Sequence, residues 1–274
     1  MRFGVYVPTF GEYDVKTLAA LAGEAEASGW DGFFIWDHLA WTPDGGQDLA
    51  DTTVALTAIA LATTRVRFGA LVTPLARRRP WKLAKEAVTL DHLSGGRLVL
   101  AVGLGAQGDI MPFGDGAAPT ELAARLDEGL ELLALLWSGQ PVSHEGEYFR
   151  VQDAVLRPAP LQQPRIPVWV AGFWPNRPPF RRAARWDGAL PLARGHLMKE
   201  LPPGEMRGCR DYISAHRRSS HPFDLVAFAA TQPRTPETVA EYEDAGATWW
   251  VEAVDPLAES LADFRARIGR GPIR

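Results

Sequence analysis

The alternation of short, continuously apolar segments with helical segments most constrains the fold of this chain. Eight apolar segments lie along it: 3–7, 33–36, 66–72, 97–103, 168–172, 188–192, 224–230 and 249–254. Strands that are apolar along their whole length are buried on both faces, which is typical of parallel sheets. Segments with helical spacing of apolar residues lie between them. The order predicts β/α units that together build one parallel sheet.

Start and stop signals delimit the helical segments. Asp14 is expected to cap a helix over 14–28 that Gly29 ends, and Pro80 suits the first turn of a helix that ends at Gly95-Gly96. Further helices are expected over 51–64 and 120–137. Helical segments are also expected between the later strands, although segment 193–222 is rich in Pro, Gly, His and Arg and shows little periodicity; no long lid is expected after the seventh strand.

The strand count and length favour a barrel. At 274 residues the chain is within the range of one (β/α)8 TIM barrel, so we expect a single domain over 1–274. Four prolines and the alternating stretch "EGEYFRV" predict a small hairpin excursion around 140–165, outside the main repeat. A doubly wound open sheet is the alternative, but eight strands favour the barrel.

Composition excludes several classes of protein. Cys209 is the only cysteine, which excludes an intrachain disulfide and a Cys₄ zinc site. With 29 basic and 33 acidic residues and a net charge of −4, the chain has no footprint for nucleic acid or an anionic membrane. No apolar run is long enough to span a membrane, and the first residues lack the apolar core of a signal peptide. We therefore expect a cytoplasmic protein.

Few reactive side chains follow the strands, where barrel enzymes place their chemistry. Asp37 and His38 follow segment 33–36, and Thr73 follows segment 66–72. No lysine ends a strand, and the chain has no Walker A loop and no G-x-S-x-G elbow. The harder chemistry is then expected from a bound organic cofactor. A metal-dependent barrel hydrolase is a weaker alternative, because carboxylates and histidines are sparse at these ends.

The glycine-rich stretch "GLGAQG", residues 103–108, spells G-x-G-x-x-G after a strand. It lies on the fourth strand, and no helix opens directly after it, so dinucleotide binding in the Rossmann manner is disfavoured. Two interpretations stay open. The loop is an ordinary glycine-rich turn, or its missing side chains let a flat ring approach the backbone.

Several stretches together resemble the bacterial luciferase-like flavin oxidoreductases, a family with FMN-dependent monooxygenases and enzymes that use the deazaflavin coenzyme F420. They are "FFIWDH", "GALVTPLARRRPWKLAKEAVTLDHLSGGRLVLAVGLG", "LDEGLELLALLWSGQPVSHEGEYFRV", "RPAPLQQPRIPVWVAG" and "FRRAARWDGALP". The resemblance runs from Met1 to about Val254, in the order found in the family. It implies a TIM barrel that binds FMN or F420.

The resemblance also implies roles for residues near the first four strands. His38 matches an active-site histidine that assists proton transfer; otherwise it ties down its loop. Asp37 holds His38, contacts the polar edge of the ring, or caps the loop. The bond Ala70-Leu71 matches a non-proline cis peptide that backs the ring, with an ordinary trans strand as the alternative. We also assign Thr73, Gly105 and Gln107 to cofactor binding.

The segment "VAGFWPNRPPFRRAARW" carries an expected site for the cofactor phosphate. Gly172, Phe173 and Trp174 end a strand, and a helix is expected after Pro178-Pro179. Its amides, with Arg177, Arg181 or Arg182, are expected to hold the phosphate; alternatively, the arginines form a solvated helix face.

Each of two further groups of residues has two interpretations. The arginine run "ARRRP" is expected to be solvated, or to attract the anionic tail of F420. Four aromatic residues are candidates for the wall of an apolar substrate pocket, with core packing as the alternative: Trp41, Trp81, Phe173 and Trp174.

The combined prediction is an oxidoreductase or monooxygenase that uses reduced FMN or F420, with His38 assisting proton transfer to or from a small organic substrate. A non-catalytic flavin carrier or sensor is the alternative. A separate flavin or F420 reductase is a candidate partner. A homodimer is expected if the ten tryptophans leave exposed aromatic surface.

Overall fold

Eight parallel strands form the centre of the molecule. The computed structural model describes residues 1–40, 46–109, 111–195, 200–229, 235–255 and 258–273. The strands are β1 (Arg2–Val7), β2 (Gly32–Ile35), β3 (Arg67–Ala70), β4 (Leu100–Val102), β7 (Val168–Trp174), β8 (Gly188–Ala193), β9 (Asp224–Ala229) and β10 (Trp249–Ala253). Their order in the sheet is β3-β2-β1-β10-β9-β8-β7-β4. Each strand therefore lies beside its neighbour in the chain, as in a barrel.

The barrel closes between β3 and β4 through isolated parallel bridges. Phe68 pairs with Leu98, and Thr73 pairs with Val102. A Cβ atom on Gly69 would lie 2.1 Å from the carbonyl oxygen of Val99, so glycine permits this close approach of the two backbones. The predicted (β/α)8 barrel is confirmed, and the doubly wound alternative is wrong.

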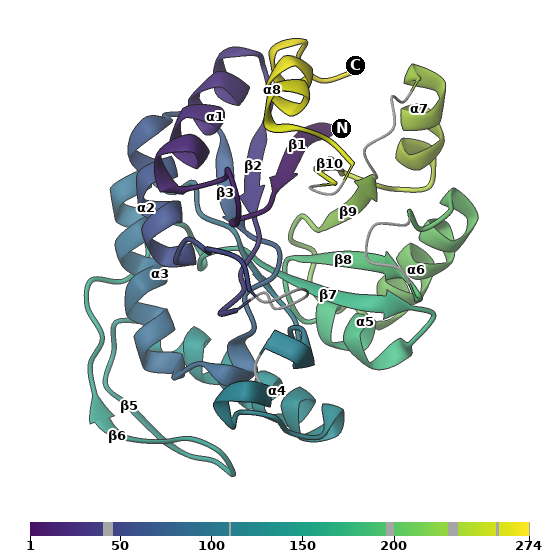
Figure 1. The fold of residues 1–274 in the computed structure, drawn as a ribbon. Coiled ribbons are helices and arrows are strands. Elements are labelled where there is room, and N and C mark those ends of the chain that lie inside the picture. The colour runs from purple at the N-terminus through teal and green to yellow at the C-terminus, as the bar shows by residue number, and fades with distance from the viewer. Residues whose placement is uncertain (41–45, 110, 196–199, 230–234, 256–257, 274) are drawn as a thin grey trace.

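The helices surround the strands, as Figure 1 shows. They are α1 (Val15–Ala27), α2 (Thr52–Ala62), α3 (Pro80–Ser94), α4 (Pro119–Leu136), α5 (Arg177–Ala183), α6 (Pro203–His216), α7 (Pro236–Asp244) and α8 (Leu261–Gly269). The expected helices over 14–28, 51–64 and 120–137 are confirmed within two residues at each end. The helical segment expected between the strands at 188–192 and 224–230 is confirmed as α6, which buries Met206, Cys209 and Ile213 at helical spacing.

The predicted excursion is confirmed. Strands β5 (Val142–Glu145) and β6 (Arg150–Ala154) pair antiparallel outside the barrel (Figure 1). Glu128 of α4 holds the turn between them. Its carboxylate accepts hydrogen bonds from the backbone N–H groups of Tyr148 and Phe149 and lies 3.0 Å from Nε2 of His144.

Two tryptophans fill the barrel opposite inward-facing glycines. Trp169 and Trp249 are fully buried, and their ring centroids lie 5.5 Å apart in an edge-on arrangement. A Cβ atom on Gly188 would lie 2.3 Å from Cδ1 of Trp169, and one on Gly32 would lie 2.8 Å from Cζ3 of Trp249. The large side chains therefore fit because the neighbouring strand positions lack side chains.

A partly buried carboxylate, that of Glu26, joins α1 to the loop between α2 and β3. Glu26 accepts hydrogen bonds from the backbone N–H groups of residues 64, 65 and 66. Burial alone would raise the pKa of Glu26, but these donors outweigh it and lower the pKa to about 2.

Within the described residues, no helix is long and apolar enough to cross a membrane. The exposed aromatic surface expected from the tryptophans is small, since among those described only Trp81 is exposed. The homodimer stays a prediction, but exposed tryptophans do not support it.

Candidate functional site

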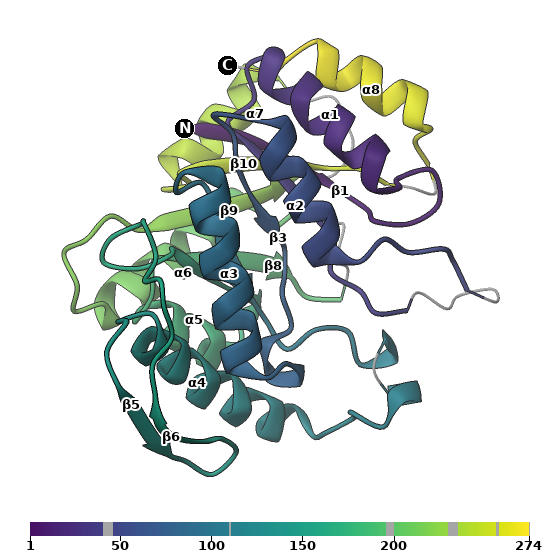
Figure 2. The ribbon, with the colours of Figure 1, turned by 90° about the vertical axis from the view of Figure 1, so that its left-hand side faces the viewer.

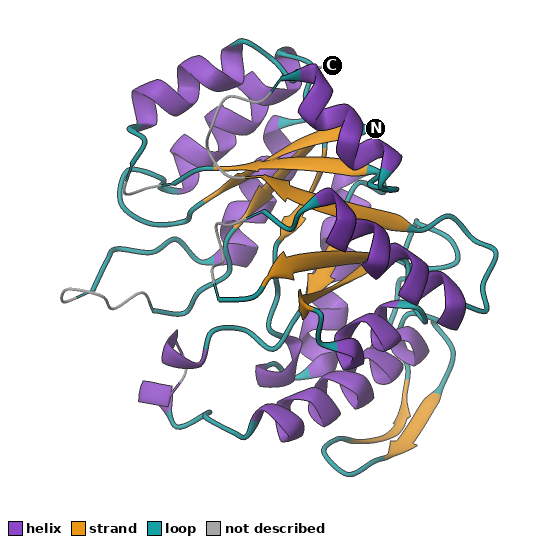
Figure 3. Ribbon diagram, turned by 90° about the vertical axis from the view of Figure 1, so that its right-hand side faces the viewer, coloured by secondary structure: helices purple, strands orange, loops and turns teal. Residues whose placement is uncertain are grey.

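The candidate site lies at the carboxyl ends of the strands. Figures 2 and 3 both show the loops that follow β2 and β4 projecting beyond the same end of the barrel. The β2–α2 loop carries Asp37 and His38. The β4–α4 loop contains two short 3₁₀ helices, η3 (Gln107–Asp109) and η4 (Met111–Phe113). A third turn, η2 (Leu75–Arg77), follows β3.

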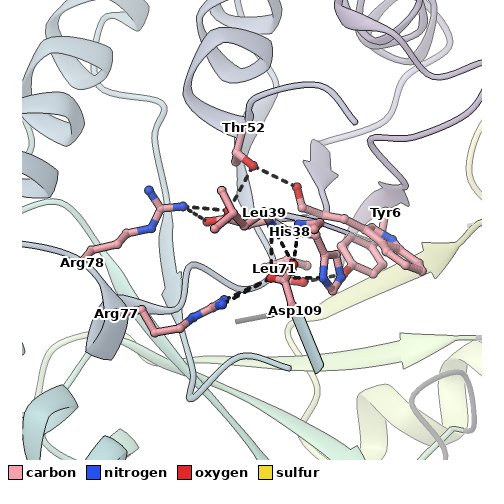
Figure 4. Close-up of polar contacts among 11 residues, drawn as sticks. Tyr6, His38, Leu39, Thr52, Leu71, Arg77, Arg78 and Asp109 are labelled. Atoms are coloured by element: carbon pink, nitrogen blue, oxygen red, sulfur yellow. Dashed lines mark hydrogen bonds and ion pairs between the residues drawn. The ribbon is translucent and has the colours of Figure 1, made fainter. Parts of the chain in front are cut away.

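Asp109 connects these three loops (Figure 4). Its Oδ2 atom lies 3.6 Å from Nδ1 of His38 and 3.3 Å from Nη1 of Arg77. Its Oδ1 atom accepts hydrogen bonds from the backbone N–H groups of Leu39 at 2.9 Å and Ala40 at 2.6 Å. The carboxylate therefore binds the backbone directly after His38 and lies beside the imidazole itself.

The environment shifts the pKa of both groups downward. Burial alone would raise the pKa of Asp109, but the N–H groups of Ala40 and Leu39 and the neighbouring positive charges lower it, so the carboxylate stays ionised. Burial lowers the pKa of His38, and the attraction of Asp109 and Asp37 only partly opposes this. His38 is accordingly neutral at neutral pH.

Asp37 forms a second ion pair beside the first. Nη2 of Arg78 lies 2.7 Å from both carboxylate oxygens of Asp37, and the hydroxyl of Thr52 donates to Oδ1 at 3.1 Å (Figure 4). Burial raises the pKa of Asp37, and the charge of Arg78 opposes that rise. Asp37 contacts Arg78 and Thr52. None of these contacts is a hydrogen bond to His38, so the predicted role of Asp37 in holding His38 stays a prediction.

Two aromatic side chains lie beside His38. The ring of Trp36 lies 5.5 Å from that of His38 and stacks on Tyr6 at 5.7 Å. Tyr6 donates its hydroxyl to the carbonyl oxygen of Leu71, and burial raises the pKa of Tyr6 well above its usual range. Tyr6 therefore remains a protonated donor.

The non-proline cis peptide occurs one bond later than predicted. It joins Leu71 to Val72, so the expectation for Ala70-Leu71 is wrong. The strand ladder explains the offset, because the N–H of Leu71 still donates to the carbonyl oxygen of Ile35 in β2. Ala70 thus belongs to β3, and Leu71 accepts the hydroxyl of Tyr6.

The glycines after β4 have a packing role that the sequence did not reveal. Gly105 has a φ of +76°, and a Cβ atom there would lie 2.8 Å from both Nη2 of Arg77 and Cβ of Pro74. The loop therefore accommodates the β3–α3 turn. Gln107 begins η3, and Thr73 is buried where β3 meets β4.

The end of β7 differs from the expected phosphate loop. Gly172, Phe173 and Trp174 belong to the strand, and α5 begins at Arg177 rather than after the prolines. A Cβ atom on Gly172 would lie 2.3 Å from Cβ of Pro179, so the absence of a side chain at Gly172 leaves room for α5. Because residues 178 and 179 are prolines, the first turn of α5 lacks two of the N–H groups expected to hold an anion.

Arg177 begins α5 and stacks on two aromatic rings. Its guanidinium lies 4.3 Å from the ring of Trp174 and 4.6 Å from the ring of Tyr212. Within the described part of the chain, no carboxylate lies within ion-pair distance of Arg177. Of the other two candidates, Arg182 is buried and pairs with Asp127 of α4, which argues against a phosphate role, and the role of Arg181 stays a prediction.

Other expectations for charged and aromatic residues need correction. Arg77 and Arg78 are not a solvated run, because each pairs with a carboxylate of the site. Trp81 lies on α3 beside Phe149 of the hairpin, away from the mouth. Trp174 is buried against Phe180, while Phe173 is exposed. Trp41 lies outside the described residues.

The sequence interpretation missed the central position of Asp109. The signal available was that the loop after β4 carries a carboxylate, Asp109, and that adjacent arginines follow β3 at the same end of the barrel. Among the residues that the structure describes, no three His, Cys, Asp or Glu side chains come together in a group that could hold a metal ion.

Comparison with known proteins identifies relatives. A family model described as luciferase-like monooxygenase matches residues 1–185. The F420-dependent glucose-6-phosphate dehydrogenase of Nakamurella multipartita is 35% identical over 178 residues, which are 64% of this chain and 51% of that protein. The enzyme of the same name from Microbacterium testaceum is 32% identical over 178 residues, 64% of this chain and 52% of that protein. The chain spans about half the length of these curated relatives.

Solved structures share the fold. The F420-dependent tetrahydromethanopterin reductase from Methanopyrus kandleri has a TM-score of 0.77 at 17% identity, covering 98% of this chain and 96% of its own. An F420-dependent secondary alcohol dehydrogenase in complex with an F420-acetone adduct has a TM-score of 0.78 at 17% identity, covering 98% and 99%. A long-chain alkane monooxygenase has a TM-score of 0.69 at 16% identity, covering 89% and 68%.

Proposed function

The chain belongs to the luciferase-like monooxygenase family, and from this premise we propose that it is an oxidoreductase that binds coenzyme F420 at the mouth of its barrel. The observation that carries the proposal is His38, a neutral, largely buried imidazole beside an ionised carboxylate at the end of β2. FMN is the second candidate cofactor. The F420-dependent relatives favour F420, and the resemblance to FMN-dependent monooxygenases favours FMN.

The residues at the mouth fit a flat ring with an anionic tail. Val72, Ala171 and Leu192 are partly buried against the interior of the barrel and offer apolar surface. Arg177, stacked between two aromatic rings and without a carboxylate partner among the described residues, offers a cation for a phosphate. When bound, the cofactor supplies the hydride chemistry that the side chains of the chain lack.

The chain's own residues would move a proton and exclude water. His38, whose pKa is lowered, would accept the proton of a substrate hydroxyl at neutral pH. The rings of Tyr6 and Trp36 would keep the entrance dry. Three exposed apolar side chains on the loops around the mouth favour an apolar organic substrate: Leu39, Met111 and Phe113.

The first experiment measures cofactor binding. Purified protein is titrated with F420 and, separately, with FMN, and binding is followed by fluorescence quenching and absorbance. Binding of F420 in preference to FMN supports the proposal, and binding of neither contradicts it. Binding without turnover of any member of a substrate panel, including secondary alcohols and glucose 6-phosphate, favours the non-catalytic carrier instead.

The second experiment tests His38. The variant His38→Gln is expected to bind the cofactor within about twofold of wild type and to lose roughly 100-fold or more in kcat, the usual contribution of a general base. In the wild type, kcat/KM should fall on the acid side with an apparent pKa below 6.5, because burial lowers the pKa of His38. Unchanged turnover in the variant would remove the assigned role.

A further inference from the structure

We propose that Asp109 is a positioning residue that fixes the tautomer of His38, keeping the proton on Nδ1 and leaving Nε2 as the proton acceptor. Nothing in the sequence patterns or in the comparisons gives this residue a role. Its consequence for turnover rests on the proposed function, whereas its effect on the imidazole can be measured without any cofactor.

The contact geometry supports one tautomer. Oδ2 of Asp109 lies 3.6 Å from Nδ1 of His38, which is longer than a direct hydrogen bond, so the carboxylate acts on the imidazole through its charge; the two side chains are 2% and 15% exposed. An ionised carboxylate only accepts hydrogen bonds, so a neutral imidazole facing it is favoured with its hydrogen on the facing nitrogen. The other nitrogen, Nε2, then carries the lone pair.

The surroundings keep Asp109 ionised and immobile. Its two oxygens receive the backbone N–H groups of Leu39 and Ala40 and both terminal nitrogens of Arg77. The side chain of Arg77 is only 7% exposed, so the cation is not shared widely with solvent. Charge-assisted bonds of this kind are stronger than neutral ones, which makes protonation of Asp109 at neutral pH unfavourable.

Asp109 also holds the backbone directly after His38. Leu39 and Ala40 follow His38 directly, so the bonds from their N–H groups hold the backbone next to the ring. One carboxylate thus holds the main chain of Leu39 and Ala40 and places its negative charge next to Nδ1 of His38. This dual contact distinguishes a positioning role from a simple loop staple, in which only the backbone would be held.

The hairpin offers a matched control. Glu128 likewise accepts two backbone N–H groups, from Tyr148 and Phe149, and faces a histidine, His144, at 3.0 Å. It lies on α4 beside the excursion, away from the barrel mouth. Substituting Glu128 therefore reproduces the loss of a carboxylate that caps a loop without touching His38.

The test reads the tautomer directly by NMR. Protein labelled with ¹⁵N-histidine is measured at pH 8, and the signals of His38, one of six histidines, are assigned by their loss in His38→Gln. Wild type and Glu128→Gln are expected to show His38 mainly protonated on Nδ1. Asp109→Asn, whose amide group can donate to Nδ1, should shift the population toward protonation on Nε2, and Asp109→Glu should restore the wild-type state at least in part.

A second reading separates this proposal from the proposed function. With F420 and a substrate found active in the panel, Asp109→Asn should lose about tenfold or more in kcat while its affinity for F420 changes less than threefold. His38 protonated on Nε2 in the wild type, or an unchanged tautomer in Asp109→Asn, would overturn the proposal. If the asparagine variant does not fold, the wild-type tautomer and that of Asp109→Glu decide it. Failure of the wild type to bind F420 or FMN would contradict the proposed function and leave the NMR result valid.

Discussion

Replacing Arg78 by methionine tests how the buried charge of Asp37 is tolerated. The Asp37 side chain is 5% exposed, whereas that of Arg78 is 32% exposed. Nη2 of Arg78 contacts both carboxylate oxygens at 2.7 Å, and Thr52 supplies one further hydrogen bond. Methionine keeps much of the volume of arginine but leaves the carboxylate without its cation.

The expected cost follows from this unequal burial. Removing one partner of a buried ion pair costs about 3–5 kcal/mol, because the other charge is left uncompensated. Since a third of the Arg78 side chain is exposed and solvent screens the pair, we expect a loss of about 2–3 kcal/mol. For a chain of this size, each kcal/mol lowers Tm by roughly 2–4 °C, so the melting temperature should fall by about 4–12 °C.

The assay is a double-mutant cycle of urea unfolding and thermal melts. Asp37→Asn should cost less than Arg78→Met, because the freed guanidinium can reach solvent whereas the carboxylate cannot. The double variant Arg78→Met/Asp37→Asn should recover much of the loss of Arg78→Met, since no buried charge remains. We therefore expect the wild type to be the most stable, Asp37→Asn and the double variant to be intermediate, and Arg78→Met to be the least stable.

The pH dependence gives the same reasoning a second test. Burial raises the pKa of Asp37, and removing Arg78 raises it further. A carboxyl group with a raised pKa binds its proton more tightly in the folded state, so stability falls as pH rises above the unfolded value of about 3.9. The loss in Arg78→Met should be larger at pH 8 than at pH 5. If Asp37→Asn costs as much as Arg78→Met, or if the loss does not depend on pH, the account of this pair is wrong.

Two predictions concern the scaffold. Glu26→Gln should destabilise the fold by about 1–2 kcal/mol at pH 7 in urea unfolding, because the carboxylate of Glu26 accepts hydrogen bonds from three backbone N–H groups. The folded state lowers the pKa of Glu26 to about 2, so the carboxylate stabilises the fold above its unfolded pKa. This stabilisation should disappear as pH falls from about 4.5 toward 2. Gly188→Ala should cost about 1–3 kcal/mol, because the added Cβ would lie 2.3 Å from Trp169. Gly204→Ala, where nothing lies within 4 Å, should not destabilise, and equal melts for the two alanine variants would contradict the packing argument.

Much of the architecture followed from local patterns. Apolar runs of strand length and helices with cap signals are properties of neighbouring residues, so the number of strands, the helices around Asp14 and Pro80, and the hairpin were all predictable. The adjacency of Asp37 and His38 at the end of an apolar strand was equally local. Helix α6 left little periodic signal in the sequence, because its three buried residues are separated by charged and polar ones.

The pairings within the site were not local. Arg78 and Asp37 are 41 positions apart, and Asp109 and the backbone of Leu39 are 70 positions apart. Sequence patterns place each of these residues after a strand, but they do not say which carboxylate meets which arginine. The closed barrel decides that, because it brings the loops after β2, β3 and β4 side by side.

The sequence alone determined a barrel of eight parallel strands, with an imidazole and a carboxylate at the end of the second. Only the tertiary structure decided that His38 faces Asp109 rather than its neighbour Asp37, and that glycines opposite Trp169 and Trp249 serve the packing of the barrel. The physical reason is that periodicity and capping depend on residues within a few positions, whereas charge pairing and close packing depend on which distant backbones the closed sheet brings together.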